Sequence, residues 1–258
     1  MSGERSGERF RDVLRGTIDG KTVVARRGAT VLETAESVGI RIPTLCHREG
    51  LPPDGNCRLC VVETKGKLVI SCMFPVREDG FAILTQSPGV REARRFVLSL
   101  MLNRAPKAPA ILKLAGEYGA GADPRFSRDP DNCVRCGRCV RACRANRTEA
   151  IALVGRGFER SVSGPFEKPP PDCVGCLSCA FVCPTGNILY SERDGKRRIW
   201  DKEFRLVPCP ECGTPVFTEE QIRFLGEKAS GLCPECGRRR LASALRNAEP
   251  LSGGSRGF

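Results

Sequence analysis

The chain has 258 residues and a formal net charge of +12, and 40% of its residues are hydrophobic. This length suits one large domain or two to three small ones, and the 28 glycines and 19 prolines predict many loops. No apolar run approaches the ~20 residues of a membrane span, and the sequence opens with a charged segment. We therefore expect a cytoplasmic protein with no direct membrane span.

Cysteine is the outlier in this composition. The sixteen cysteines fall into four groups of four, with none left over. In a reducing compartment, cysteines at such close spacing bind metal more often than they form disulfides. The groups are Cys46, Cys57, Cys60 and Cys72; Cys133, Cys136, Cys139 and Cys143; Cys173, Cys176, Cys179 and Cys183; and Cys209, Cys212, Cys233 and Cys236.

The first group belongs to a segment, residues 12–88, that follows a polar tail over residues 1–11. Asp19–Gly20 is a hairpin dipeptide between two short strands. Thr30 and Glu33 form a capping box at the start of a short helix. A ligand loop follows, and two strands joined at Lys65–Gly66 lead to the last cysteine of the group. This order predicts a β-grasp domain holding one [2Fe–2S] cluster, with the ligands Cys46, Cys57, Cys60 and Cys72.

A helical connector is expected over residues 89–122, and a two-cluster ferredoxin domain over residues 123–195. The runs "CVRCGRCVRAC" and "CVGCLSCAFVC" both have the spacing C-x2-C-x2-C-x3-C. In bacterial two-cluster ferredoxins the fourth cysteine of each such run ligates the other cluster. Two zinc knuckles would leave the third and fourth cysteines of each run unexplained. We assign one [4Fe–4S] cluster to Cys133, Cys136, Cys139 and Cys183, and the other to Cys173, Cys176, Cys179 and Cys143.

Several residues beside these ligands invite interpretation. Arg144 stands where the full ferredoxin motif has proline, which is not a ligand. Arg135, Arg138 and Arg141 alternate with the cysteines, and we expect their charges to raise the neighbouring reduction potential by stabilising the added electron. His47, the single histidine, adjoins Cys46. Because four thiolates already complete that site, we expect His47 to orient its surroundings rather than to bind metal.

The fourth group predicts a zinc-ribbon module over residues 205–240, in which two C-x2-C pairs on rubredoxin-like turns bind one zinc ion or one iron ion. Between the pairs we expect an amphipathic helix capped by Thr218, with acidic residues in its first turn and apolar side chains facing inward. Residues 192–204 are expected to link this module to the ferredoxin domain, and residues 241–258 to form a tail. The acidic pair is Glu219 and Glu220, and the inward set is Ile222, Phe224 and Leu225.

The segment from "TIDGKTVV" to "CVGCLSCAFVCPTG", roughly residues 12–190, resembles the N-terminal iron–sulfur region of the large iron–sulfur subunit of respiratory complex I. It is equally similar to the diaphorase iron–sulfur subunit of NAD-reducing nickel–iron hydrogenases. Related parts occur in iron-only hydrogenases and in NAD-dependent formate dehydrogenases. The resemblance implies a relay that carries electrons between a flavin-bearing partner and a catalytic partner.

One departure from this family concerns a third cubane, which its usual members bind through one histidine and three cysteines after the helix that starts near Val90. The equivalent stretch here, residues 103–120, has neither residue type. We expect a helix that carries Ile111, Leu112 and Leu114 to pack where that cluster would lie. The chain is thus a variant that lacks the histidine-ligated cubane, and it adds a C-terminal zinc ribbon.

The sequence therefore predicts an α+β protein that serves as a non-catalytic electron-transfer subunit of a multi-subunit oxidoreductase. Its expected cofactors are one [2Fe–2S] cluster, two [4Fe–4S] clusters and one Zn²⁺ or mononuclear iron. Its expected partners are a flavoprotein NAD(P)H-handling subunit and a catalytic, hydrogenase-like or other redox subunit. A G-x-G-x-x-G loop in strand–helix context is missing, so the nucleotide belongs to another chain.

Two alternative functions remain open. One is an iron–sulfur subunit of a flavin-based bifurcating or heterodisulfide-reductase-like complex, and the other is a redox-sensing zinc-ribbon regulator that binds DNA. The basic surplus does not demand a nucleic-acid partner. Ionised thiols and the metal centres together lower the net charge to about +4. We expect no nucleic acid among the partners.

Overall fold

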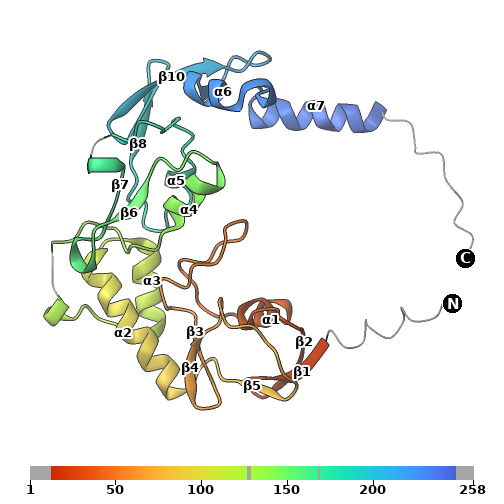
Figure 1. Ribbon diagram of the computed structural model, residues 1–258, viewed down its shortest axis with the longest axis vertical. Coiled ribbons are helices and arrows are strands. Elements are labelled where there is room, and N and C mark those ends of the chain that lie inside the picture. Colours follow the sequence, from red (N-terminus) through yellow and green to blue (C-terminus); the bar gives the residue numbers. More distant parts are fainter. Residues whose placement is uncertain (1–12, 127–128, 168, 248–258) are drawn as a thin grey trace, which may run out of the picture. The chain divides into compact units, whose positions relative to one another are not determined.

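The computed structural model describes residues 13–126, 129–167 and 169–247. Its contacts divide the chain into two units (Figure 1). The first unit comprises Met1–Lys168 with Ser178–Ile188, and the second comprises Pro169–Leu177 with Leu189–Phe258. The predicted polar tail, residues 1–11, and the end of the predicted C-terminal tail, residues 248–258, lie outside the described residues. The described parts contain no helix long and apolar enough to cross a membrane.

A β-hairpin and a short helix open the first unit. β1 (Val13–Ile18) and β2 (Lys21–Arg26) pair antiparallel about Asp19–Gly20, where φ is +50° and +79°. These left-handed values at both central positions fit the twist of a hairpin. α1 (Val31–Ser37) begins after Thr30, whose Oγ1 accepts from the Glu33 amide at 3.2 Å while its own amide donates to Glu33 Oε2 at 2.7 Å. The predicted turn and capping box are confirmed.

A parallel strand completes the β-grasp arrangement. β5 (Phe81–Ile83) pairs with β1, which gives a three-stranded sheet of order β2-β1-β5. β3 (Val61–Thr64) and β4 (Lys67–Ile70) form a separate hairpin about the predicted Lys65–Gly66 turn. The hairpin and the sheet enclose a buried core that includes Leu14, Ile18, Leu32, Val62 and Ile83.

Two helices form the connector that follows. α2 (Pro88–Arg104) and α3 (Pro109–Tyr118) pack against each other, with Ile111 and Leu114 of α3 and Leu98 of α2 in one buried cluster. The predicted helix in residues 103–120 is therefore confirmed. Of the three apolar residues named for this helix, Leu112 does not take part in the packing, since its side chain is 50% exposed. Leu112 lies about 100° around the helix from Ile111, on the solvent side.

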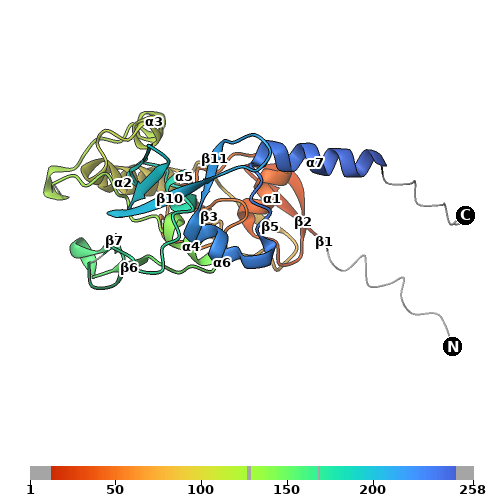
Figure 2. The same ribbon diagram turned by 90° about the horizontal axis from the view of Figure 1, so that it is seen from above.

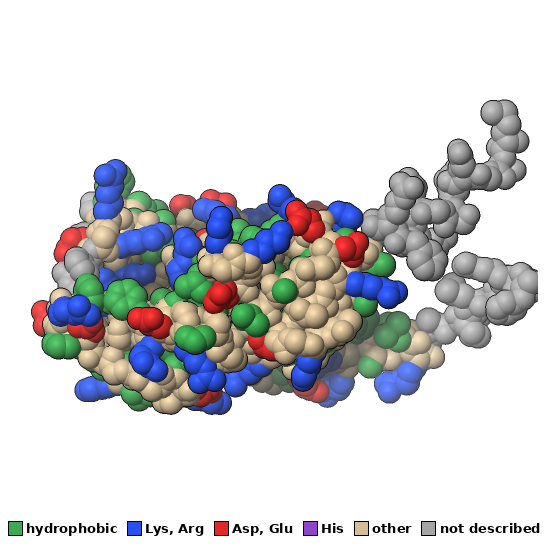
Figure 3. Space-filling model, turned by 90° about the horizontal axis from the view of Figure 1, so that it is seen from below, with side chains coloured by type: hydrophobic (Ala, Val, Ile, Leu, Met, Phe, Trp, Pro, Cys, Tyr) green, Lys and Arg blue, Asp and Glu red, His purple; other side chains and the backbone are tan. Residues whose placement is uncertain are grey.

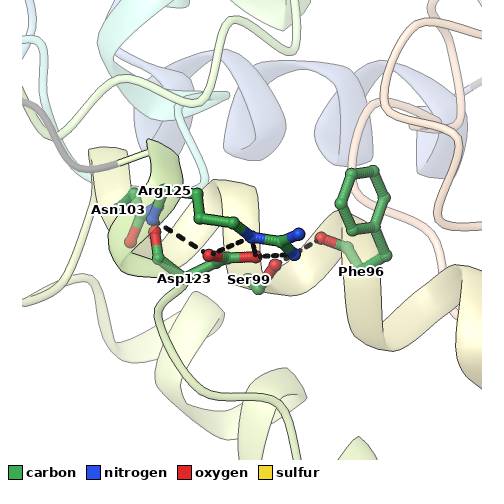
Figure 4. Close-up of polar contacts among 5 residues, drawn as sticks. All are labelled: Phe96, Ser99, Asn103, Asp123 and Arg125. Atoms are coloured by element: carbon green, nitrogen blue, oxygen red, sulfur yellow. Dashed lines mark hydrogen bonds and ion pairs between the residues drawn. The ribbon is translucent and has the colours of Figure 1, made fainter.

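The turn after α3, η1 (Pro124–Phe126), is fixed to α2 by polar and aromatic contacts. Figure 4 shows Asp123 between Asn103 and Arg125: Arg125 Nη2 lies 2.6 Å from Asp123 Oδ2, and Asn103 Nδ2 donates to the Asp123 carbonyl at 2.7 Å. The rings of Phe96 and Phe126 meet edge to face with centroids 5.9 Å apart. These contacts fix the end of the connector against α2, just before the first ferredoxin run begins.

The rest of the first unit carries the ferredoxin-like elements. α4 (Arg138–Ala145) and α5 (Ser178–Phe181) pack against each other, and Asn146 Nδ2 donates to Ser178 Oγ at 2.7 Å just beyond α4. A small antiparallel hairpin of β6 (Ala152–Val154) and β7 (Ser161–Ser163) lies between them in sequence. The short 3₁₀ turns η2 (Gly157–Glu159) and η3 (Pro165–Glu167) flank β7.

The second unit is built on an antiparallel sheet of order β11-β10-β9-β8, with strands β8 (Tyr190–Arg193), β9 (Lys196–Ile199), β10 (Lys202–Pro208) and β11 (Pro215–Thr218). The segment expected to link two modules, residues 192–204, is therefore itself part of this sheet. These residues form β9, part of β8 and the start of β10. Alternate side chains of β9 and β10 are buried, which gives the sheet one inner face.

Helices follow the sheet in the second unit. α6 (Glu219–Leu225) is capped by Thr218 as predicted, with the Thr218 Oγ1 accepting from the Gln221 amide at 3.0 Å. The predicted inward packing of Phe224 and Leu225 is wrong, because their side chains are 48% and 39% exposed. After η4 (Gly226–Lys228), α7 (Pro234–Asn247) projects from the sheet in Figure 2. Residues 241–247, predicted as tail, are the last two turns of α7.

Candidate metal centres

The four predicted [2Fe–2S] ligands are all buried and come together around the loop that follows α1. The Cys46 amide donates to Cys57 Sγ at 3.3 Å. The Cys57 thiol in turn donates to the Cys46 sulfur, which lowers the pKa of Cys46 to about 5. Cys72 donates to the Cys60 sulfur and lowers the pKa of Cys60 to about 6.

The two pairs also lie within electrostatic reach of each other. The pKa of Cys72 is raised above its ordinary value by its bond to Cys60 and by burial, and further by negative charge on Cys60, Cys46 and Cys57. Four buried sulfurs that raise and lower one another's pKa form a donor set that suits a cationic metal core, because the metal charge offsets thiolate repulsion. The residues present therefore fit the predicted cluster.

The two ferredoxin runs fold in the same local way. In the first run, the residues before and after Cys136 are Arg135 and Gly137, with φ of +56° and +71°. The matching residues beside Cys176 are Gly175 and Leu177, with φ of +69° and +64°. Arg135 and Leu177 adopt a conformation that ordinary residues seldom take. A repeated left-handed geometry is expected if each loop must wrap the same inorganic core.

The first unit contains the four residues assigned to the first [4Fe–4S] cluster. Burial is the main cause that raises the pKa of Cys136, and negative charge on Cys183 and Cys133 raises this pKa further. Cys183 thus lies near the first run, as cross-ligation requires. Its Sγ also accepts from the Asn187 amide at 3.3 Å. An amide–sulfur bond of this kind is one of the contacts that tune a cluster's potential.

The second [4Fe–4S] set falls in both units. Cys143 and Cys179 belong to the first unit, whereas Cys173 and Cys176 belong to the second. Cys143 Sγ accepts from the Ala150 amide at 3.2 Å. The ligation of this cluster by Cys173, Cys176, Cys179 and Cys143 stays a prediction.

The arginines of the first run point to an unexpected target. Arg138 Nη2 donates to the carbonyl of His47 at 2.6 Å, and Arg141 donates to the carbonyls of Cys46 and Pro52, the latter at 2.5 Å. α4 therefore contacts the [2Fe–2S] ligand loop directly. The sequence places these arginines beside their own cluster, but the partner carbonyls lie 89–95 residues away in the chain, and no local pattern identifies them.

His47 contributes to this contact through its backbone. Its ring Nδ1 is buried and finds no hydrogen-bond partner among the residues that the structure describes. The expected orienting role of the imidazole thus has no hydrogen bond to support it, and remains a prediction.

Cys209, Cys212, Cys233 and Cys236 form a compact group in the second unit, with sulfurs within 4.8 Å of one another. Cys209 and Cys212 follow β10 in a knuckle closed by the Gly213 amide, which donates to the Cys209 carbonyl at 2.8 Å. Cys233 and Cys236 lie at the start of α7, where the Gly237 amide donates to the Cys233 carbonyl at 2.8 Å, so the second pair is closed by the same bond as the first. Four thiols this close fit a single tetrahedral metal ion.

Hydrogen bonds lower the pKa of two thiols of this site, whereas burial and bonds to the other cysteines raise the pKa of Cys236. The Cys233 amide donates to Cys209 Sγ at 3.3 Å and lowers the pKa of Cys209 to about 6. Thr214 lowers the pKa of Cys212 through its hydroxyl and amide. Arg239, one turn into α7, donates to Cys236 Sγ at 3.4 Å.

On the face drawn in Figure 3, Lys and Arg side chains are spread among acidic and apolar side chains. They do not gather into one continuous patch on that face. Several of the arginines with identified partners instead donate to carbonyl groups, as Arg138 and Arg141 do.

Comparisons with known proteins bear on the cysteine-rich segments. Residues 11–88 match the model of the "2Fe-2S iron-sulfur cluster binding domain", and residues 128–190 match that of the "4Fe-4S dicluster domain". An NADH-quinone oxidoreductase subunit of Rhizobium meliloti is 33% identical over 78% of this chain and 27% of its own length. The NADP-reducing hydrogenase subunit HndD of Solidesulfovibrio fructosivorans is 35% identical over 89% of this chain and 44% of its own length.

A solved structure is also similar. A chain of an NAD⁺-reducing [NiFe]-hydrogenase in the H₂-reduced state matches with a TM-score of 0.60 and 28% identity, covering 67% of this chain and 85% of that chain. The present chain spans less than half the length of the two curated relatives. The predicted resemblance to the iron–sulfur regions of complex I and of hydrogenase subunits is confirmed.

Proposed function

We propose that the chain conducts electrons as a subunit of a multi-subunit oxidoreductase. It joins a [2Fe–2S] cluster binding domain to a [4Fe–4S] dicluster domain, as the N-terminal iron–sulfur region of complex I and hydrogenase diaphorase subunits does. Electrons pass between a flavoprotein that handles NAD(P)H and a catalytic redox partner. The clusters supply the one-electron chemistry when bound, and the chain positions them and sets their potentials.

The contact between Arg141 and the carbonyl of Cys46 carries this proposal. Cys46 is a predicted [2Fe–2S] ligand, and α4 supplies the predicted cubane ligands Cys139 and Cys143. Arg138 adds a second bond from α4 to the same loop. Since tunnelling rates fall steeply with distance, a loop and a helix held in hydrogen-bond contact favour direct transfer between the two centres. A histidine-ligated cubane is then not needed between them.

Anaerobic isolation of the full chain tests the cofactor content. We expect about ten iron atoms per chain and EPR signals of one reduced [2Fe–2S] and two reduced [4Fe–4S] clusters. NADH or NADPH alone should leave the chain oxidised, and an added flavoprotein from the same host should reduce it. A colourless, iron-poor chain would contradict the proposal.

Arg141→Gln tests the electron route. Rapid-freeze EPR after mixing with less than one equivalent of reductant should show slower equilibration between the [2Fe–2S] cluster and the cubanes. The matched control is Arg144→Gln, which removes the same charge from an exposed position on the same helix. Equal rates in both variants and the wild type would exclude a route through the Arg141 contact.

For the C-terminal site we propose zinc, because closed four-cysteine sites most often hold a structural zinc ion. The site is buried at three of its four cysteines, Cys212 being exposed. Elemental analysis of the purified chain should give one zinc per chain beyond the cluster iron. One additional iron in its place would assign the site to mononuclear iron.

A further inference from the structure

The loop that carries Cys173 and Cys176 is held by side chains of the C-terminal sheet. Lys202 Nζ donates to the carbonyls of Pro170, Pro171 and Cys173 at 3.2, 2.8 and 3.0 Å. Arg197 Nη1 donates to the Gly175 carbonyl at 2.7 Å. Thr218 Oγ1 donates to the Val174 carbonyl at 2.5 Å. Three side chains therefore fix five carbonyls of one short loop.

The sheet presents these donors on a single face. Lys202 and Phe204 are two apart on β10, and Arg197 of β9 is the register partner of Phe204. Thr218 ends β11 opposite Leu206 of β10. Phe204 is 1% exposed, and a Cβ atom at Gly175 would lie only 2.9 Å from its ring. The loop is thus seated on the sheet by both packing and hydrogen bonds.

The direction of the carbonyls has a consequence for the amides. In a planar trans peptide the C=O and N–H groups point in opposite directions. Carbonyls of residues 173–175 that point to the sheet turn the amides of residues 174–176 away from it. A cluster held by Cys173 and Cys176 on that opposite side of the loop would accept hydrogen bonds from these amides. Such bonds to sulfur help to set a cluster's potential.

The charge of Lys202 also favours a higher reduction potential for a cluster held by this loop. Glu192 Oε1 pairs with Arg197 at 2.7 Å and offsets its charge. Lys202 has no carboxylate partner in the portion of the chain that the structure describes, and its Nζ lies 5.2 Å from the centre of the Phe204 ring. An ammonium group without a carboxylate partner, hydrogen-bonded to the Cys173 carbonyl, stabilises negative charge gained by a cluster across the loop.

From this geometry we propose that the C-terminal sheet is a platform for the second ferredoxin loop, and that Lys202 is a positioning residue that raises the reduction potential of the cluster held by Cys173 and Cys176. The inference rests on the proposed function, since it needs that cluster. It gives the C-terminal module, which neither matched domain covers, a role in electron transfer.

EPR-monitored redox titration of the full, anaerobically purified chain tests the role of Lys202. Lys202→Met removes the ammonium group but keeps an unbranched stem over Phe204. We expect one [4Fe–4S] midpoint to become more negative, while the [2Fe–2S] midpoint stays in place. Lys202→Arg should restore the potential. The control is Lys196→Met, which removes the same charge from an exposed position on the same sheet, where Lys196 pairs with Glu203 at 2.7 Å.

Unchanged midpoints in Lys202→Met, or equal shifts in Lys202→Met and Lys196→Met, would overturn the inference. If Lys202→Met instead loses one cubane's iron while Lys202→Arg keeps it, the platform is supported. The cubane midpoint potential is then measured in the Thr218→Val variant. That variant removes a neutral donor to the same loop, and its cubane midpoint should also fall; an unmoved midpoint there counts against the inference. A wild-type chain without cubanes contradicts the proposed function instead, so the two failures are distinguishable.

Discussion

Arg94 donates from Nη1 to the phenol oxygen of Tyr118 at 3.1 Å, and its guanidinium lies 5.4 Å from the centre of the same ring. Arg94 belongs to α2 and is fully buried, while Tyr118 ends α3. The remaining donors of Arg94 reach the carbonyls of Leu59, Val61 and Thr85 at 3.2, 2.7 and 2.9 Å. Two of these carbonyls flank Cys60, so this side chain joins the connector to the [2Fe–2S] ligand loop.

The first prediction concerns this buried guanidinium. Arg94→Met should lower the free energy of unfolding by about 3 kcal/mol, because it leaves several buried carbonyls without donors. Urea denaturation of the anaerobic holoprotein measures the change. Arg95→Met is the control, since Arg95 is exposed and makes one weak bond, to the Tyr118 carbonyl at 3.4 Å. Equal midpoints for the two variants would show that the Arg94 contacts add little.

A second prediction concerns Gly175, where φ is +69° and an added Cβ would lie 2.9 Å from the Phe204 ring and 3.0 Å from Thr218 Cγ2. Gly175→Ala should displace the loop and lower the iron content by up to about four atoms per chain. Gly186→Ala is the matched control, because Gly186 has a similar φ of +64° but no atom within 4 Å of an added Cβ. Iron loss in both variants alike would point to backbone strain rather than to the contact with the sheet.

The third prediction concerns metal removal from the C-terminal site. Cys236→Ala should remove one metal ion per chain and reduce the helical circular dichroism, because Cys236 anchors the start of α7. The EPR signal of the [2Fe–2S] cluster should persist, since its four predicted ligands belong to the other unit. A chain that keeps its full metal content after this change would show that the four cysteines do not share one ion.

The fourth prediction concerns Arg239, whose Nη2 donates to Cys236 Sγ. Arg239→Gln should weaken metal binding about tenfold, a typical loss when a group that orients a ligand is removed. Competition with a chromophoric chelator measures the affinity. Arg240→Gln, which removes a cation paired with Glu211 at 3.4 Å, should change the affinity little. The idea fails if the two variants lose affinity to the same degree.

Local signals in the sequence account for much of the fold. The Asp19–Gly20 and Lys65–Gly66 turns and the Thr30–Glu33 capping box involve neighbours in sequence, so their chemistry is visible in a short window. The same kind of signal is present at Asp194–Gly195, where φ is +51° and +69° between β8 and β9. That dipeptide indicates the hairpin that the structure contains, in place of the link expected over residues 192–204.

The hydrogen bonds that hold the ligand loops of the candidate sites are not predictable in this way. Lys202 lies 29–32 residues from the carbonyls that it holds, and Arg94 lies 33 and 35 residues from those beside Cys60. From sequence alone, a long cationic side chain is predicted to be a solvated surface group, because only the folded structure shows which acceptors it reaches. Helix faces present the same difficulty: the patterns of Leu112 and Phe224 indicate an apolar stripe but not which neighbour covers it.

The bonds from α4 to the carbonyls of Cys46, His47 and Pro52 bear on how this polypeptide can be dissected. Expression of residues 12–88 alone would retain every [2Fe–2S] thiol yet replace the guanidinium donors with water. Such a fragment would be a poor stand-in for the intact chain. The end of the first matched domain at residue 88 is thus not a place where the protein can be cut without altering the first cluster's surroundings.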